Sequence, residues 1–504
     1  MEKIISGYKF NILTTVPTEP ILDLNGEHWV VTAVKLNAFT DEIDTLTHTK
    51  QFHMFRSNIV QKMVGDIFIL EDLLHGDAIV IISESPDFFK AELTVKNKKV
   101  TLLNGTNPAA IGYCKVGECE KLCRLYSKSA RQGAKLITMS NTWGDRNLDT
   151  RVCEEFVLKE IDKAAELNID IVQIDDGWQL HSTEDLTRRD DQDRRIFDED
   201  FWQVNPTRFP NGIKPLAEYA AKKGVKVGLW FAPDSRDAFA ARDRDVKILK
   251  NAYDDWGVRF FKLDMYWIQN DAERDGFLDL LQKIYSFGDD VAVQLDVTRF
   301  DRINYLCGKQ YGTAFVENRY NKLRSAFPYR ILKNIWMLGK YVPTSKCQFE
   351  LVNPDLNPDC YLPDDIFAPI NYDLDYMFAA VMLSNPLFWM EIQFLSDERA
   401  KQLNRLMPVW QANRDAFSAA DVMPIGNQPS GRSFSGFYVD AEDDEYLLLF
   451  REATDQNSFI FTAPIKGKDF EVLATNSDVD VNISGQNIVA SFGKQNAYVL
   501  LKLK

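Results

Sequence analysis

The sequence predicts an α/β protein built around a (β/α)8 TIM barrel, flanked by an N-terminal β-sandwich and a small C-terminal antiparallel β domain. Eight short apolar runs in the middle of the chain alternate with longer amphipathic stretches, as buried parallel strands alternate with covering helices. The alternation covers about 260 residues, the size of such a barrel. On either side, short strands are separated by Gly, Asn, Asp and Pro, which is typical of antiparallel sheets.

The β-sandwich is expected over residues 1–107. Its predicted strands include Trp29–Leu36, Asp66–Leu70, Ala78–Ser83 and Ala91–Val95. A linking segment with a helical pattern around Lys115–Ser127 is expected over residues 108–133. The C-terminal β domain is expected over residues 416–504. Its predicted strands are Gly436–Val439, Tyr446–Phe450, Ser458–Thr462, Asp469–Leu473 and Ala497–Leu503.

The catalytic barrel is expected over residues 134–415. Its predicted strands are Leu136–Ser140, Ile171–Ile174, Val225–Phe231, Phe260–Leu263, Val291–Leu295, Thr313–Val316, Cys347–Leu351 and Leu387–Met390. The helical patterns between them are Val152–Leu167, Ile213–Lys223, Asp243–Trp256, Ala272–Tyr285, Asn321–Leu338 and Leu374–Leu383. The active site of such a barrel lies at the carboxyl ends of the strands, so the residues that follow each run are candidates for function.

Charge and histidine content narrow the chemistry. The 504 residues include 59 Lys and Arg against 74 Asp and Glu, a net charge of −15. Such a field repels phosphate backbones and anionic lipids, so we expect no nucleic-acid or membrane partner. Only five histidines occur, four of them in the first 75 residues, which makes a metal centre or a histidine-based triad hard to build in the barrel. We therefore expect carboxylates to perform the chemistry, without a cofactor or metal ion.

The chain also shows few signs of export or membrane insertion. No apolar run reaches about 18 residues, and the N-terminus lacks the apolar segment of a signal peptide. The seven cysteines do not form a disulfide framework. We expect a cytoplasmic protein, and the sequence leaves open a removed leader and a homo-oligomer.

Polar and aromatic residues follow most of the predicted barrel strands. In strand order they are Asn141-Thr142-Trp143, Asp175-Asp176-Gly177-Trp178, Trp230 with Asp234, Lys262 with Asp264, Gln294 with Asp296, Glu317-Asn318-Arg319 and Glu391. Carboxylates accept hydrogen bonds from sugar hydroxyls, indoles stack on sugar C–H faces, and glycosidic cleavage needs two further carboxyl groups. A single Asp at a strand end is usually a helix cap or part of a turn, but the repetition favours a sugar-active site.

Four motifs, in this order, resemble the family 36 α-galactosidases of the clan of retaining α-glycosidases. They are Asn141-Thr142-Trp143, Ile174-Asp175-Asp176-Gly177-Trp178, Gly228-Leu229-Trp230-Phe231 and Lys262-Leu263-Asp264-Met265. The resemblance extends to the order of the three domains. It implies that Asp264 is the nucleophile and that Lys262 reaches a sugar hydroxyl and favours ionised Asp264. The other substrate-binding residues that it implies are Asp175, Asp176, Trp143 and Trp230.

The acid/base residue is harder to assign. In the family it is the Asp of a Ser-Asp-Asn motif after strand six, and the matching segment here is Val316-Glu317-Asn318. Glu317 is therefore the candidate, with Asp296 and Asp234 as alternatives. The extra methylene of Glu moves the proton by about 1 Å unless the backbone compensates, and such a displacement slows catalysis.

Two further departures bear on the sugar. The family's glycine-rich segment after strand five is replaced by Gln294-Leu295-Asp296-Val297-Thr298, and its Glu-Pro-Glu after strand three by Ala232-Pro233-Asp234. The resemblance places Gln294 and Asp296 near the 2-position of the sugar. These changes therefore affect the predicted sugar more than the predicted reaction.

The resemblance implies a retaining α-glycoside hydrolase that is most similar to α-galactosidases. Its partner would be an oligosaccharide or glycoside, from which it removes a terminal α-linked sugar by double displacement. The alternatives are an α-N-acetylgalactosaminidase or transglycosidase of the same clan, and a carbohydrate-binding protein with a decayed site.

Overall fold

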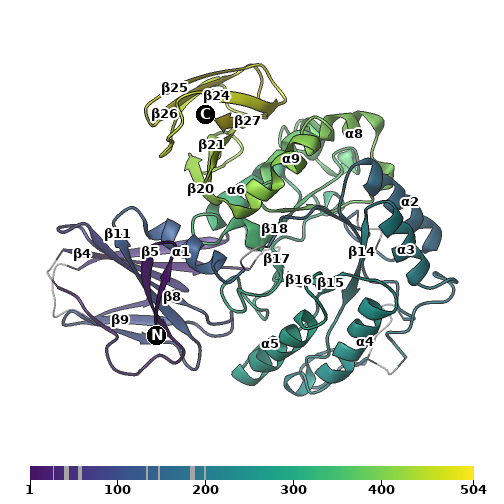
Figure 1. Cartoon of the computed structure of the whole chain (residues 1–504), viewed down its shortest axis with the longest axis horizontal. Helices are drawn as coiled ribbons and strands as arrows, with labels where there is room; N and C mark the ends of the chain where they lie inside the picture. Colours follow the sequence, from purple (N-terminus) through teal and green to yellow (C-terminus); the bar gives the residue numbers. More distant parts are fainter. Residues whose placement is uncertain are drawn as a thin grey trace.

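The computed structural model describes residues 1–25, 28–38, 45–54, 60–131, 134–145, 148–181, 188–197 and 200–504. A closed barrel of eight parallel strands lies between antiparallel sheets at either end of the chain (Figure 1). In Figure 1 the N-terminal sheets lie at the lower left, the barrel on the right and the C-terminal sheets at the top. The predicted fold class is confirmed, whereas the division at residues 107, 133 and 415 stays a prediction.

The N-terminal part is a two-layer sandwich. One sheet has the order β1 (Glu2–Ile5), β2 (Tyr8–Leu13), β11 (Ala109–Lys115), β8 (Asp77–Ser83), β7 (Ile67–Asp72), β4 (Trp29–Leu36) and β5 (Thr47–Met54). The other has the order β3 (Leu22–Asp23), β10 (Lys99–Leu103), β9 (Glu92–Lys96) and β6 (Gln61–Val64). Side chains of β4 alternate between two cores: Val31 and Ala33 pack between the sheets, and Val34 and Leu36 pack in the core that continues into the barrel. Because β11 belongs to the first sheet, that sheet extends past residue 107.

The barrel strands pair in chain order. They are β12 (Met139–Asn141), β13 (Ile171–Ile174), β14 (Lys226–Phe231), β15 (Phe260–Leu263), β16 (Ala292–Asp296), β17 (Thr313–Phe315), β18 (Cys347–Leu351) and β19 (Asn385–Phe388). Each overlaps one of the eight predicted runs; β19 begins two residues before its run, and β12 and β16 each end one residue after theirs. These strands are buried almost throughout, which is why they appear in the sequence as continuous apolar runs rather than as an alternation.

Helices cover the barrel and join it to the sheets. They are α1 (Cys119–Lys128), α2 (Glu154–Glu166), α3 (Lys214–Lys222), α4 (Arg242–Asp254), α5 (Asp271–Tyr285), α6 (Pro328–Leu338), α7 (Leu374–Val381), α8 (Asp397–Leu403) and α9 (Met407–Ala419). The predicted helix from Asn321 starts later, at Pro328, because a proline disfavours helical backbone in the residue before it. Accordingly, Phe327 is extended. No helix of the described chain is long and apolar enough to cross a membrane.

The C-terminal part contains two antiparallel sheets. One has the order β20 (Asp421–Gly426), β21 (Phe434–Ala441), β22 (Asp444–Arg451), β27 (Ala497–Leu503) and β24 (Phe470–Thr475). The other has the order β23 (Ser458–Thr462), β26 (Asn487–Phe492) and β25 (Val479–Ser484). Strands β20, β25 and β26 were not predicted from the sequence. In β25, Asp480 and Asn482 occupy alternate positions, and both residue types are rare in strands.

Candidate active site

A pocket of about 220 Å³ lies at the carboxyl ends of the barrel strands. Seven predicted site residues line it: Trp143, Asp175, Asp176, Trp230, Lys262, Asp264 and Asp296. The remaining lining residues are Arg195, Met265, Asn318, Tyr320 and Trp389. Most of the residues that were predicted from their position at the carboxyl ends of strands therefore lie in one pocket. Glu317, Gln294 and Asp234 lie outside this lining.

Asp264, directly after β15, is held as a carboxylate. Its Oδ2 accepts a hydrogen bond from the indole nitrogen of Trp230 at 3.1 Å, and its Oδ1 accepts one from Arg302 Nη1 at 3.1 Å. The backbone N–H of Met265 also donates to Oδ1. Burial disfavours the charge, but the positive charges of Arg302 and Lys262 outweigh it and lower the pKa of Asp264 to about 2. An ionised carboxylate at this position is available as a nucleophile.

Lys262 supplies a fixed positive charge to the pocket. Its Nζ donates to Asp175 Oδ2 at 2.9 Å, and the same oxygen accepts a hydrogen bond from Asn141 Nδ2 at 2.7 Å. Burial opposes the ammonium form, but the charges of Asp175, Asp264 and Asp296 outweigh that effect and raise the pKa of Lys262. The side chain therefore stays protonated although it is only 3% exposed.

Asp296, at the end of β16, has the opposite protonation preference. Its Oδ1 accepts hydrogen bonds from the backbone N–H and the hydroxyl of Thr298, at 3.0 and 2.7 Å. Burial and the nearby charge of Asp264 raise the pKa of Asp296 to about 6, against the attraction of Arg302 and Lys262. The pocket thus contains one carboxyl group that is ionised and another that binds a proton more readily. This is the arrangement required of a nucleophile and an acid/base.

The structure does not bring Glu317 into the pocket. The carboxylate is fully buried, and it accepts hydrogen bonds from Arg319 Nε at 2.9 Å and from Asn334 of α6. Asn318 and Tyr320 line the pocket instead. This follows the alternation of an extended chain, in which neighbouring side chains point to opposite sides. The side chain that this segment offers to a ligand is therefore an amide, which cannot serve as a general acid.

Gln294 and Asp234 also have other partners. Gln294 donates a hydrogen bond to Gln348 and is fully buried. Asp234 forms ion pairs with Arg236 at 2.6 Å and Arg244 at 3.3 Å. Burial opposes ionisation, but the hydrogen bond and charge of Arg236 outweigh it and lower the pKa of Asp234, which argues against a role as a general acid.

Several residues at the site were not predicted from the sequence. Trp389 was inside the predicted eighth strand and Tyr320 followed the sixth, so a wider search of strand ends would have found both. Arg195 comes from the long connection between β13 and α3, and Arg302 from the connection after β16. No local pattern marks either arginine in the sequence.

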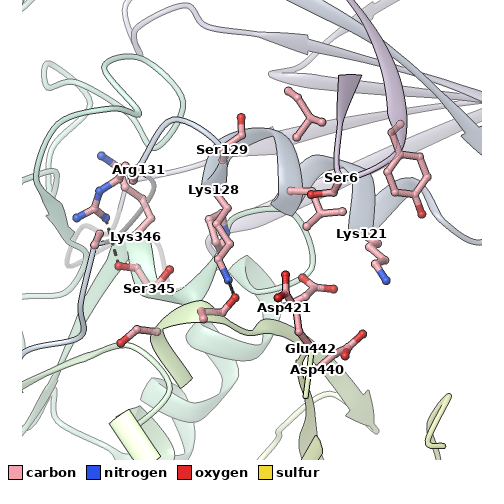
Figure 2. A pocket seen from close by; sticks show the side chains of 18 of the residues that line it. Ser6, Lys121, Lys128, Ser129, Arg131, Ser345, Lys346, Asp421, Asp440 and Glu442 are labelled. Carbon is pink, nitrogen blue, oxygen red and sulfur yellow. Dashed lines mark hydrogen bonds between the residues drawn. The ribbon is translucent and has the colours of Figure 1, made fainter. Parts of the chain in front are cut away.

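A larger cavity of about 980 Å³ is lined by the first strands, α1, α9 and the C-terminal sheet (Figure 2). It contains none of the predicted site residues. Lys128 donates a hydrogen bond to a backbone carbonyl, and Arg131 Nη1 donates to the carbonyl of Ser345 at 3.2 Å (Figure 2). Lys346 likewise donates to the backbone carbonyl of Tyr311. These cations hold neighbouring segments of backbone. Among the described residues, no group of His, Cys, Asp and Glu is arranged to hold a metal ion.

Comparison with known proteins supports the family resemblance. The Melibiase family model matches residues 123–260, from α1 to the start of β15. α-Galactosidase Mel36A of Lactobacillus acidophilus is 38% identical over 74 residues, 15% of this chain and 9% of that protein. α-Galactosidase AgaA of Geobacillus stearothermophilus is 35% identical over 94 residues, 19% of this chain and 11% of that protein. The matched segments thus span only about a tenth of the length of these curated relatives.

Solved structures extend the likeness to the whole fold. The crystal structure of the GH36 α-galactosidase AgaA has a TM-score of 0.66 at 13% identity, covering 98% of this chain and 76% of that one. The galactosidase domain of the α-galactosidase–sucrose kinase AgaSK has a TM-score of 0.69 at 12% identity, covering 100% and 77%. A putative α-galactosidase from Bacteroides fragilis has a TM-score of 0.52 at 14% identity, covering 100% and 99%. The resemblance is confirmed: the chain is similar to the glycoside hydrolase family 36 α-galactosidases in sequence over residues 123–260 and in fold over nearly its whole length.

Proposed function

We propose that the chain is a retaining α-galactoside hydrolase in which Asp264 is the nucleophile and Asp296 is the general acid and base. The observation that carries this proposal is a pair of buried carboxyl groups in one pocket whose pKa values are shifted in opposite directions. Environments that separate two carboxyl groups in this way assign them different roles. Asp296 replaces Glu317 in the proposal because Glu317 lies outside the pocket.

The reaction follows from these two protonation states. Ionised Asp264 attacks the anomeric carbon while Asp296 protonates the departing oxygen, which leaves a covalent glycosyl-enzyme. Asp296 then takes a proton from water as the water attacks the same carbon. Two inversions give net retention. Such a pair is typically about 5–5.5 Å apart, close enough for one carboxylate to attack from one side while the other serves the leaving group.

The pocket also suits a terminal sugar. In this proposal Asp175, Asp176 and Lys262 bind hydroxyl groups of the sugar, and the indoles of Trp143 and Trp230 contact its C–H faces; all five residues line the pocket. AgaA variants, which share the fold, have been crystallised with raffinose and stachyose. We therefore propose α-galactosyl oligosaccharides as the substrates.

Proton NMR of the reaction tests both activity and mechanism. We expect the wild-type chain to cleave an aryl α-galactoside and to release the α-anomer first, before mutarotation produces the β-anomer. A first product with β configuration would overturn the retaining mechanism. The matching α-N-acetylgalactosaminide and added acceptor sugars, tested in parallel, distinguish the other activities of the clan.

A non-catalytic sugar-binding protein is the second candidate. The observation that favours it is Asn318, the side chain that reaches the pocket from the segment where the family carries its acid. Under this alternative, Asp296 would serve only to bind a hydroxyl group. Calorimetric binding of α-galactosides without cleavage of any of them, including the activated fluoride, would select it over the hydrolase.

A further inference from the structure

A second pocket, of about 160 Å³, shares a wall with the candidate active site. Arg195 and Met265 line both pockets, and Met265 directly follows the proposed nucleophile Asp264. The charged residues that line the second pocket are Arg189, Arg194, Arg195, Arg299 and Asp193. Four guanidinium groups against one carboxylate run counter to the net charge of −15, so the bulk composition does not explain this lining.

Three of these arginines come from one short hairpin in the connection between β13 and α3. An antiparallel bridge pairs Arg189 with Arg195, and Asp193 turns the chain with a φ of 63°. The backbone N–H of Arg194 donates to Asp190 Oδ1 at 2.8 Å and closes the turn. Residues paired across such a bridge present their side chains next to each other on one face. The hairpin therefore brings Arg189 and Arg195 to the same pocket.

Carboxylates that do not line the pocket hold two of these guanidinium groups, those of Arg194 and Arg299. Arg194 pairs with Asp190 at 2.9 Å and with the buried Glu273 at 3.0 Å. Arg299 pairs with Asp301 at 3.2 Å. None of these three acids is among the described residues that line the pocket. A guanidinium has five N–H donors in a planar fork, so a group that is held on one edge keeps donors for a ligand on another.

We propose that this second pocket binds an anionic substituent on the leaving group, so that the preferred substrate is an α-galactoside of an acidic sugar or polyol. This inference rests on the proposed function, and it places the leaving group on the side of the first pocket where Arg195 and Met265 separate it from the second. Arginine forks bind carboxylate, phosphate and sulfate groups through paired hydrogen bonds. Trp267 also lines the second pocket, and the Arg299 guanidinium lies 4.6 Å from the centroid of its ring, a contact that holds Arg299 beside the pocket.

The test compares α-galactosyl-(1→6)-glucose with the aldonate made by oxidising its reducing end. Both substrates break a bond to the same primary-alcohol oxygen, so the leaving-group chemistry is matched. At low salt we expect kcat/KM for the aldonate to be about tenfold higher, and this preference to shrink as salt screens the charges. A third substrate is the same disaccharide with a phosphate on the anomeric oxygen of its reducing end. Its kcat/KM, compared with that of the aldonate, shows whether the pocket prefers a phosphate or a carboxylate.

Two variants locate the effect. Arg299→Gln removes a guanidinium that lines only the second pocket, and we expect it to reduce the tenfold preference to about threefold or less. Lys247→Gln, which removes one positive charge from the exposed side of α4, is the matched control and should keep the full preference. Equal loss of preference in both variants would overturn the local site.

The outcomes separate this inference from the proposed function. Cleavage of both disaccharides with equal kcat/KM would overturn the anionic subsite and leave the hydrolase standing. If neither is cleaved, the hydrolase proposal fails, and calorimetry with the wild-type chain then decides the subsite. Equal affinity for the disaccharide and its aldonate would overturn the anionic subsite, and tighter binding of the aldonate would support it.

Discussion

The pocket at the strand ends and the larger cavity beside α1 and α9 both contain lysines, but the two regions use them differently. In the pocket, Lys262 faces carboxylates that raise its pKa. In the cavity, burial lowers the pKa of Lys128 to about 8 and that of Lys346 well below its ordinary value, and both donate to backbone carbonyls. The two regions thus differ in the partners of their lysines: carboxylates surround the lysine of the candidate active site, whereas backbone carbonyls bind the lysines of the larger cavity. The volume of a cavity alone does not indicate a reactive site.

Removal of the proposed nucleophile from the pocket should lower activity more than any change at the larger cavity. Asp264→Ala is expected to lower kcat by at least about 10⁴-fold, because double displacement has no substitute for the attacking carboxylate. Initial rates with an aryl α-galactoside measure the loss, and circular dichroism checks that the fold is intact. A folded variant that keeps the wild-type rate would exclude Asp264 as the nucleophile.

Removal of the proposed acid should have the next largest effect. Asp296→Asn is expected to lower kcat/KM by about 10²- to 10⁴-fold for an α-galactosyl oligosaccharide, whose leaving group needs a proton. The loss should be much smaller for α-galactosyl fluoride, since fluoride departs without one.

Glu317→Gln is the matched control for this variant. Glu317 is buried against Arg319 outside the pocket, so its replacement should reduce thermal stability and leave the fluoride-to-oligosaccharide rate ratio unchanged. If the altered ratio appears in Glu317→Gln instead, the acid/base role returns to Glu317.

The pH profile should report the raised pKa of Asp296. The protonated form is the active acid, so kcat/KM is highest below this pKa of about 6 and falls about tenfold per pH unit above it. Asp264, with its lowered pKa, stays ionised throughout this range. Thr298→Val removes a hydroxyl that donates to ionised Asp296, so the alkaline limb should move to higher pH. A limb that stays in place or moves to lower pH would show that another group sets it.

The sequence predicted the barrel well because its buried strands appear directly as apolar runs. The sequence also predicted that Asp175, Lys262 and Asp264 lie close together, because parallel strands end at one edge of the barrel. Glu317 does not line the pocket although its neighbour Asn318 does, because a shift of one residue along an extended chain reverses the side to which a side chain points. Gln294 lies too deep in the barrel, whereas Asp296, two residues later, reaches the pocket. Arg195 depends on a hairpin in a long connection, for which the sequence contains no periodic signal.

The smallest effect on activity should come from the junction at the larger cavity. Arg124 of α1 pairs with Asp421 of β20 through two bonds of 2.7 and 3.0 Å, and their side chains are only 2% and 13% exposed. Arg124→Met leaves a buried carboxylate without this partner, so we expect a loss of about 3 kcal/mol in the free energy of unfolding.

Replacement of both partners, Arg124→Met with Asp421→Leu, should recover much of that stability because no charge is then left buried alone. In both variants kcat/KM should stay within about twofold of the wild-type value at 25 °C, since effects at distant sites without shared partners are independent. Thermal unfolding and initial rates measure the two quantities on the same samples. A large fall in kcat/KM while the chain remains folded would show that the junction controls the geometry of the strand ends. The two regions would then act as one unit, and the distinction between reactive site and structural junction would fail.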